Sequence, residues 1–221
     1  MPSFSAIIFD MDGVIVDSEP LHERAFREVF TEIGYAATHG VDFPAYFGKS
    51  DVVLWRDFIA QHRPPHTLDE LLGRKERHFD RFIRAEEPIF AGLPELLAKA
   101  AARFPLGLAS GSRHATINSV LQLRGLRKFF RAIVSSEDVP RGKPAPDVFL
   151  RTAALLAVEP ARCVVIEDSA AGVEAAEAAG MTTIAITNSL PAERLAHAHH
   201  VVSTYAEIER LLLPDATQRH P

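Results

Sequence analysis

Short apolar segments that stop at polar residues constrain the fold of this chain more than any other feature. Each segment is too short and too continuous for an amphipathic helix, and several are rich in Val and Ile, as buried parallel strands are. The segments are AIIFD (6–10), LGLAS (106–110), AIVSS (132–136), CVVIED (163–168) and TTIAIT (182–187), with HVVST (200–204) as a weaker sixth.

Helical patterns separate the later segments. They cover residues 113–123, 145–156 and 169–179, and Gly180 is a suitable C-terminal cap for the last. Strands that alternate with helices indicate βαβ units. We therefore predict an α/β fold with a Rossmann-like, doubly wound parallel sheet.

The long interval between the first two strands does not fit this alternation. Residues 20–34 place apolar side chains on one helical face before Gly34, and residues 67–87 open with a capping box formed by Thr67 and Glu70. A further helical pattern at 92–104 would return to the core. We predict an all-helical domain over residues 20–86, inserted in a core made of residues 1–19 and 87–221.

Composition narrows the class of protein. The chain has 221 residues, a net charge of -5 and no long basic block, which argues against a nucleic acid or a membrane surface as its partner. A single cysteine, Cys163, excludes a disulfide within the chain. We find no signal-peptide pattern and no apolar run long enough for a membrane helix. We expect a soluble, cytoplasmic monomer.

Polar residues follow four of the predicted strands. Parallel strands present their carboxyl ends at one rim, where ligands bind. Each residue also has an ordinary structural explanation as a turn residue, a helix cap or a solvated surface group. The residues are Asp10 and Asp12, then Ser110, Gly111 and Ser112, then Lys143, and finally Glu167 and Asp168.

Several carboxylates at one rim favour a divalent cation. Two like charges about 4 Å apart repel by about 4 kcal/mol at an effective dielectric constant of about 20. Oxygen ligands without clustered His or Cys favour Mg²⁺, which also coordinates substrate phosphates. An aspartate can attack phosphorus, a second acid can protonate the leaving group, and a lysine and a hydroxyl can hold the phosphoryl oxygens.

Four segments, in order, carry a family resemblance over essentially the whole chain. FDMDGVIVDSE, LASGS, GKPAP and VVIEDSAAGVEAAEAAGM resemble the four motifs of the haloacid dehalogenase superfamily. The chain looks most similar to the phosphatase and phosphomutase branch with a helical cap. The resemblance implies that Asp10 is the nucleophile that becomes an aspartyl-phosphate. It implies that Asp12, which the dehalogenases are not expected to carry, is the general acid and base.

The same resemblance implies roles for the other rim residues. The Ser110 hydroxyl and the backbone near Gly111 and Ser112 would contact the transferring phosphoryl group, together with Lys143. Magnesium would be held by the carboxylates of Asp10 and Asp168 and by the backbone carbonyl of Asp12. Glu167 would orient the waters of the metal.

The inserted helical segment offers further candidates for substrate contact. His22 lies where related sugar-phosphate enzymes have a histidine at the hinge of the cap. The loop YFGKSD (46–51) resembles their specificity loop, with Lys49 as a phosphate ligand, and Lys75 is a second candidate. All three side chains could instead be solvated. Mutase relatives often carry an arginine where this chain has Asp51.

These features lead to three functional hypotheses. The first is a magnesium-dependent phosphatase that hydrolyses a small phosphorylated metabolite, such as a sugar phosphate. The second is an isomerase similar to β-phosphoglucomutase, which Asp51 disfavours. The third is a phosphoacceptor signalling domain, which the inserted helices and Asp12 disfavour, because an acid–base group shortens the lifetime of the phosphorylated state.

Overall fold

Six short parallel strands form one sheet in the order β3-β2-β1-β4-β5-β6. The strand β1 lies near the middle, where Ile8 pairs with Gly107 of β2 and with Val165 of β4. The computed structural model describes residues 4–46 and 49–214. The strands are β1 (Ala6–Phe9), β2 (Leu106–Ala109), β3 (Phe130–Val134), β4 (Cys163–Glu167), β5 (Thr182–Ile186) and β6 (His200–Val202). The predicted parallel sheet is confirmed.

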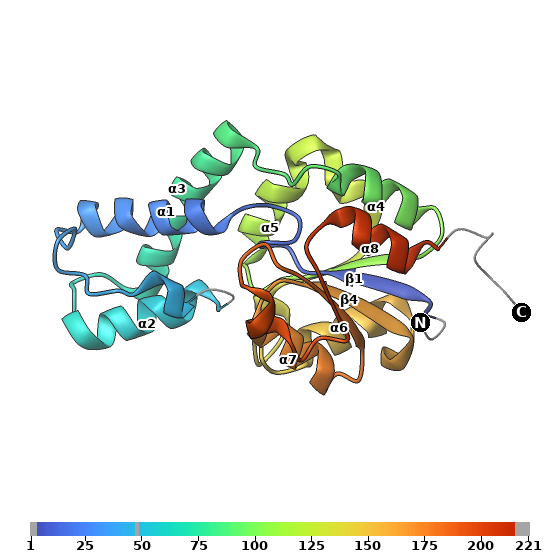
Figure 1. Cartoon of the computed structure of the whole chain (residues 1–221). Helices are drawn as coiled ribbons and strands as arrows, with labels where there is room; N and C mark the ends of the chain where they lie inside the picture. Colours follow the sequence, from blue (N-terminus) through green and yellow to red (C-terminus); the bar gives the residue numbers. More distant parts are fainter. Residues whose placement is uncertain (1–3, 47–48, 215–221) are drawn as a thin grey trace, which may run out of the picture.

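Helices cover both faces of the sheet (Figure 1). One apolar cluster joins the sheet to α4 (Leu93–Ala101), α5 (His114–Gln122) and α8 (Tyr205–Leu212). A second cluster joins the opposite face to α6 (Asp147–Leu156) and α7 (Ala170–Ala178). Strands buried on both faces explain why their sequences are continuously apolar. Short 3-10 helices occupy Phe43–Tyr46, Leu123–Phe129, Ser136–Asp138, Pro160–Arg162 and Ala192–Leu195.

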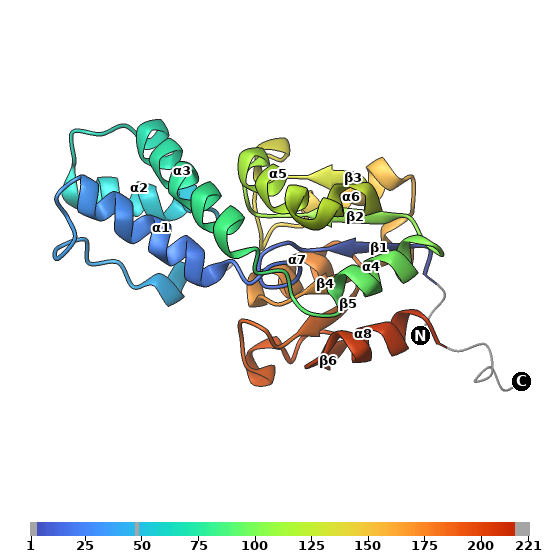
Figure 2. The same cartoon turned by 90° about the horizontal axis from the view of Figure 1, so that it is seen from above.

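The helices of residues 19–86, here called the helical module, lie beyond the carboxyl ends of the strands (Figures 1 and 2). They are α1 (Glu19–Glu32), α2 (Asp51–His62) and α3 (Leu68–Glu86). Trp55, Phe30 and Phe58 lie at the centre of an apolar cluster of their own. The predicted capping box of Thr67 and Glu70 begins α3, and Gly34, with φ +82°, follows α1.

Polar contacts hold the helical module against the core. The Arg113 guanidinium, next to α5, bonds Glu76 of α3 at 2.9 Å and Glu137 of the core at 3.1 Å. A second contact joins the Ser119 hydroxyl to Asp80. These bonds join α3 to α5 and to the residue before it. In the described part of the chain, no helix has the length and apolar character needed to cross a membrane.

Candidate active site

The chain turns sharply after β1, and this turn brings two aspartates to the rim of the sheet. Gly13 has φ +74°, a conformation that other residues rarely adopt. A Cβ atom at this position would lie 1.7 Å from Oδ2 of Asp168. The glycine of the DMDG segment is therefore required by the close approach of a carboxylate from the neighbouring strand.

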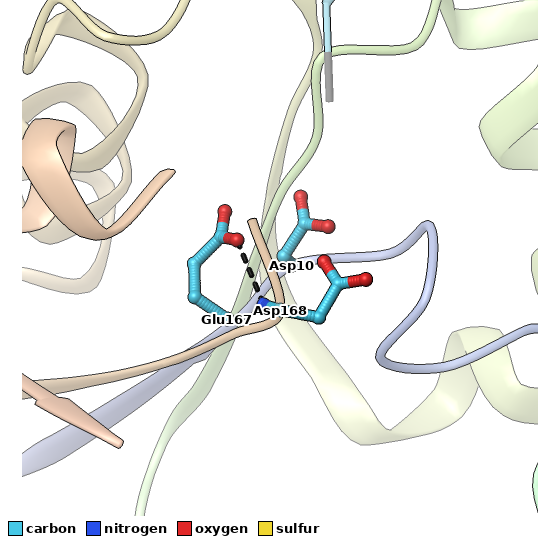
Figure 3. Close-up of side chains that lie close together, drawn as sticks. All are labelled: Asp10, Glu167 and Asp168. Carbon is cyan, nitrogen blue, oxygen red and sulfur yellow. Dashed lines mark hydrogen bonds between the residues drawn. The ribbon is translucent and has the colours of Figure 1, made fainter. Parts of the chain in front are cut away.

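Three buried carboxylates meet at this rim. Asp10, Glu167 and Asp168 each offer an oxygen within 4.8 Å of the others (Figure 3). Glu167 is fully buried, and one of its oxygens accepts hydrogen bonds from the backbone of Asp168, the backbone of Ser169 and the Ser169 hydroxyl, each at 2.9 Å. These three donors occupy one oxygen of Glu167. Asp10 and Asp168 are therefore the better ligands for a cation.

Lys143 is the cation of this cluster. Its Nζ lies 2.6 Å from Asp10 Oδ1 and 2.5 Å from Glu167 Oε1, and only 4% of the side chain is exposed. Although burial alone would lower it, the pKa of Lys143 lies above its usual value because of Asp10 and Glu167. One lysine therefore balances part of the charge of three carboxylates.

The remaining negative charge appears in the acids themselves. Burial raises the pKa of Asp10 to about 8, against the opposing effect of Lys143, while Glu167 and Asp12 add to the rise. Burial and the charges of Glu167 and Asp10 also raise the pKa of Asp168. A divalent cation would lower the pKa of both aspartates, since its positive charge favours the ionised carboxylates.

Asp12 has a different environment, although it is only two residues from Asp10. Burial alone would raise its pKa, but hydrogen bonds from His22, Ser18 and Ser112 hold the pKa of Asp12 well below its usual range. Its carboxylate accepts from Ser18 Oγ at 2.6 Å, Ser112 Oγ at 2.9 Å, His22 Nε2 at 3.1 Å and Ser110 Oγ at 3.4 Å. Two neighbouring acids with opposite shifts are suited to different chemical roles.

His22 connects Asp12 to the interior of the helical module. Its Nδ1 contacts the ammonium of Lys75, which can only donate, so Nε2 carries the proton that bonds Asp12. Lys75 is fully buried, packs against the rings of Phe26 and Phe79, and pairs with Asp51 Oδ2 at 2.7 Å.

A cavity of about 340 Å³ opens between the rim and the helical module. Its size suits a small metabolite. Two predicted residues contact this wall without belonging to it: Ser110 bonds Asp12, and Glu167 bonds Lys143. Of the residues predicted from the sequence, the wall includes Asp10, Asp12, His22, Lys49, Gly111, Ser112, Lys143 and Asp168.

Lys75 differs from the expectation. It was a candidate phosphate ligand, but it does not belong to the described wall of the cavity, and its charge is committed to Asp51 and His22. Lys49 does reach the wall; it is exposed, and its Nζ lies 5.5 Å from the centre of the Tyr46 ring. Two residues of the predicted specificity loop, 47 and 48, lie outside the described residues.

Sequence reasoning missed Ser18, Ser189 and Arg194. Ser18 is fully buried and bonds Asp12, while Ser189 and Arg194 follow β5 and line the cavity. Ser189 and Arg194 could have been predicted as site residues, because both follow the carboxyl end of a predicted strand. Ser18 gave only the signal of a helix cap.

The rim defines a parallel α/β protein whose cavity lies beside a buried lysine and a cluster of three carboxylates that could hold a metal ion. The chain matches the family of haloacid dehalogenase-like hydrolases over residues 4–180 and belongs to this family. It is a phosphoric monoester hydrolase by its relationship to named phosphatases.

Three comparisons show the range of relatives. The chain is 34% identical over 189 residues to the fructose-1-phosphate phosphatase YqaB of Escherichia coli, and the alignment covers 82% of this chain and 95% of YqaB. It is 31% identical over 202 residues to the β-phosphoglucomutase of Bacillus subtilis, with 84% of each chain covered. Its fold is similar to that of a CbbY mutant from Rhodobacter sphaeroides in complex with xylulose 1,5-bisphosphate, with a TM-score of 0.83, 25% identity, and 92% and 96% of the two chains covered.

Proposed function

We propose that this protein is a magnesium-dependent phosphatase that hydrolyses a sugar phosphate or a similar small metabolite through an aspartyl-phosphate. The observation that carries the proposal is the pair Asp10 and Asp12 at the wall of one cavity, with opposite shifts of pKa. Similarity to YqaB supports a sugar phosphate as the substrate class.

Asp10 is the nucleophile in this proposal. A bond forms between its carboxylate oxygen and phosphorus as the ester P–O bond breaks, and Asp12 gives a proton to the departing alcohol oxygen. Water then attacks phosphorus, Asp12 takes a proton from that water, and Asp10 is released with inorganic phosphate. The two half-reactions use the same two residues in opposite proton states.

Asp12 can serve both steps because its hydrogen bonds favour the ionised form and a bound phosphate favours the protonated form. In the absence of substrate its low pKa leaves it ionised, which is the form required of a base. A bound phosphate brings negative charge close to it, and like charge favours the protonated acid. The arrival of substrate therefore supplies the condition under which Asp12 becomes a proton donor.

The remaining rim residues bind and orient the phosphoryl group. Lys143, the Ser110 hydroxyl and the backbone at Gly111 and Ser112 would hold its oxygens. Asp10 and Asp168, with the backbone carbonyl of Asp12, would hold the magnesium ion, and Glu167 would hold Lys143 and the metal's waters. The three clustered carboxylates fit such an ion. When bound, magnesium neutralises the acids and the phosphate oxygens.

The helical module acts as a cap in this proposal. Residues 20–86 would cover the phosphate site on a core made of residues 1–19 and 87–221. His22 and Lys49 come from this segment and line the same cavity as Asp10. A cover that excludes water strengthens the electrostatic contacts within the site.

Similarity to β-phosphoglucomutase supports isomerase activity as a second candidate. Both reactions need a phosphorylated Asp10 and differ in what accepts the phosphoryl group, water or a sugar hydroxyl. A panel of sugar phosphates assayed with magnesium for inorganic phosphate tests the first candidate. We expect release without a bisphosphate activator, and none from the Asp10→Asn variant. Conversion of β-glucose 1-phosphate to glucose 6-phosphate that is faster than hydrolysis and depends on glucose 1,6-bisphosphate would favour the isomerase.

A further inference from the structure

We propose that Asp51 is the specificity residue of this cavity. It selects monophosphates whose far end carries only hydroxyl groups, and it rejects substrates with a second phosphate. This inference rests on the proposed phosphatase function and deepens it.

The position of Asp51 supports this role. It begins α2, lines the same cavity as Asp10 and Lys143, and 21% of its side chain is exposed. Lys75, its partner in the ion pair, is fully buried and does not belong to the described wall. A substrate in the cavity therefore meets the acid of this pair and not the lysine.

The buried lysine cannot compensate a second phosphate. Its ammonium contacts Asp51 at 2.7 Å and Nδ1 of His22. The other ring nitrogen of His22, Nε2, donates to Asp12. Turning Lys75 toward a new anion would break the contacts that orient His22. The same pairing fixes the Asp51 carboxylate, so a hydroxyl group meets a positioned acceptor that needs no ordering on binding.

The part of the wall that the helical module contributes agrees with a neutral, hydroxyl-bearing group, whereas Arg194 lines the cavity from the core, after β5. The described residues that the helical module contributes to the cavity include three acids, Glu19, Glu23 and Asp51. They include a single lysine or arginine, the exposed Lys49. Apolar side chains supply much of the remaining surface, which suits the C–H face of a sugar, and polar groups come from His22, Tyr46 and Ser50; the apolar residues are Phe26, Phe43, Pro44, Ala45 and Leu54.

Fructose 1-phosphate and fructose 1,6-bisphosphate are the probes for the test, because they differ only by the second phosphate. We expect kcat/KM of the wild-type protein for the monophosphate, with magnesium, to exceed that for the bisphosphate at least about tenfold, since one like charge at close range has this effect. Asp51→Asn removes the charge at nearly constant volume and should lower this ratio about tenfold or more.

The matched control is Glu28→Gln, which removes one negative charge from an exposed position of α1 outside the cavity wall. It should leave the ratio unchanged. Because each ratio is formed within one variant, a loss of activity common to both substrates cancels. If Asp51→Asn turns over neither substrate, the ratio of dissociation constants for the two compounds, measured by calorimetry, replaces it and should shift in the same direction.

The outcomes separate the two levels of the argument. Release of phosphate from no monophosphate in the panel would contradict the proposed function. Hydrolysis of both probes at equal efficiency by the wild type, or a ratio in Asp51→Asn equal to that in Glu28→Gln, would overturn the role of Asp51 and leave the phosphatase standing.

Discussion

Gly172→Ala tests whether the buried Glu167 organises the site. Gly172 lies in the first turn of α7, where its backbone N–H donates to Ser169 Oγ at 3.0 Å. An added Cβ would lie 1.8 Å from Glu167 Oε1, so the carboxylate must move. That movement would disturb the bond to Lys143 and the bonds from the Asp168 and Ser169 backbone.

The magnitude follows from two opposing effects. Alanine is favoured over glycine in a helix by about 1 kcal/mol at most. Overpacking costs about 1–3 kcal/mol, and each weakened hydrogen bond to a buried charge costs about 1.5–3 kcal/mol. We expect a net loss of about 2–4 kcal/mol, which lowers Tm by about 4–16 °C for a chain of this size. We also expect kcat to fall at least about tenfold, because Glu167 holds Lys143.

Calorimetry and a phosphate-release assay measure the two effects, and Gly73→Ala is the matched control. Gly73 also lies within a helix, α3, but the nearest atom to its added Cβ is Arg77 Nη1 at 3.7 Å, an ordinary contact. This variant should gain about 0.5–1 kcal/mol and keep its activity. If Gly172→Ala were as stable and as active as Gly73→Ala, the proposed link from Glu167 to Lys143 would be refuted.

Two further predictions concern the metal and the thiol. Removal of divalent ions with EDTA should abolish phosphate release and magnesium should restore it; calcium should not, because its larger and more flexible shell suits this site poorly. Activity that persists in metal-free buffer would exclude the role of Asp10 and Asp168 as ligands. Burial raises the pKa of the Cys163 thiol to about 11, so a thiol reagent at pH 8 should modify it only after unfolding. Rapid modification of the native protein would contradict the buried position.

The strands of the core could be predicted because both of their faces are buried. Each of the six apolar segments overlaps a strand of the sheet, although β3 begins two residues before its segment, at Phe130, and β4 extends to the polar Glu167. The helix α2 was not assigned, since it begins with Asp51 and two β-branched valines, Val52 and Val53, and its core residues contact α1 and α3 only after folding. Such tertiary contacts outweigh local propensity.

The residues at the rim could be placed together from the sequence, because strand ends in a parallel sheet share one edge. The burial of Lys75 and its ion pair with Asp51 could not be predicted. Whether a helical lysine faces solvent or the interior depends on the packing of α3 against α1, and the Phe26 ring and the Asp51 carboxylate that contact its ammonium come from other helices. Ser18 escaped notice for the same reason, since its role depends on the path of the chain from Asp12 into α1.

Identification of the phosphorylated residue tests the central claim most directly. The wild-type protein, mixed with magnesium and a substrate from the panel, is quenched during turnover and treated with borohydride, which reduces an acyl phosphate to an alcohol. Peptide mass spectrometry then locates the change. We predict homoserine in place of Asp10, with Asp12 and Asp168 unmodified. Continued turnover with no modification at Asp10, or modification at another acid, would contradict the proposed mechanism.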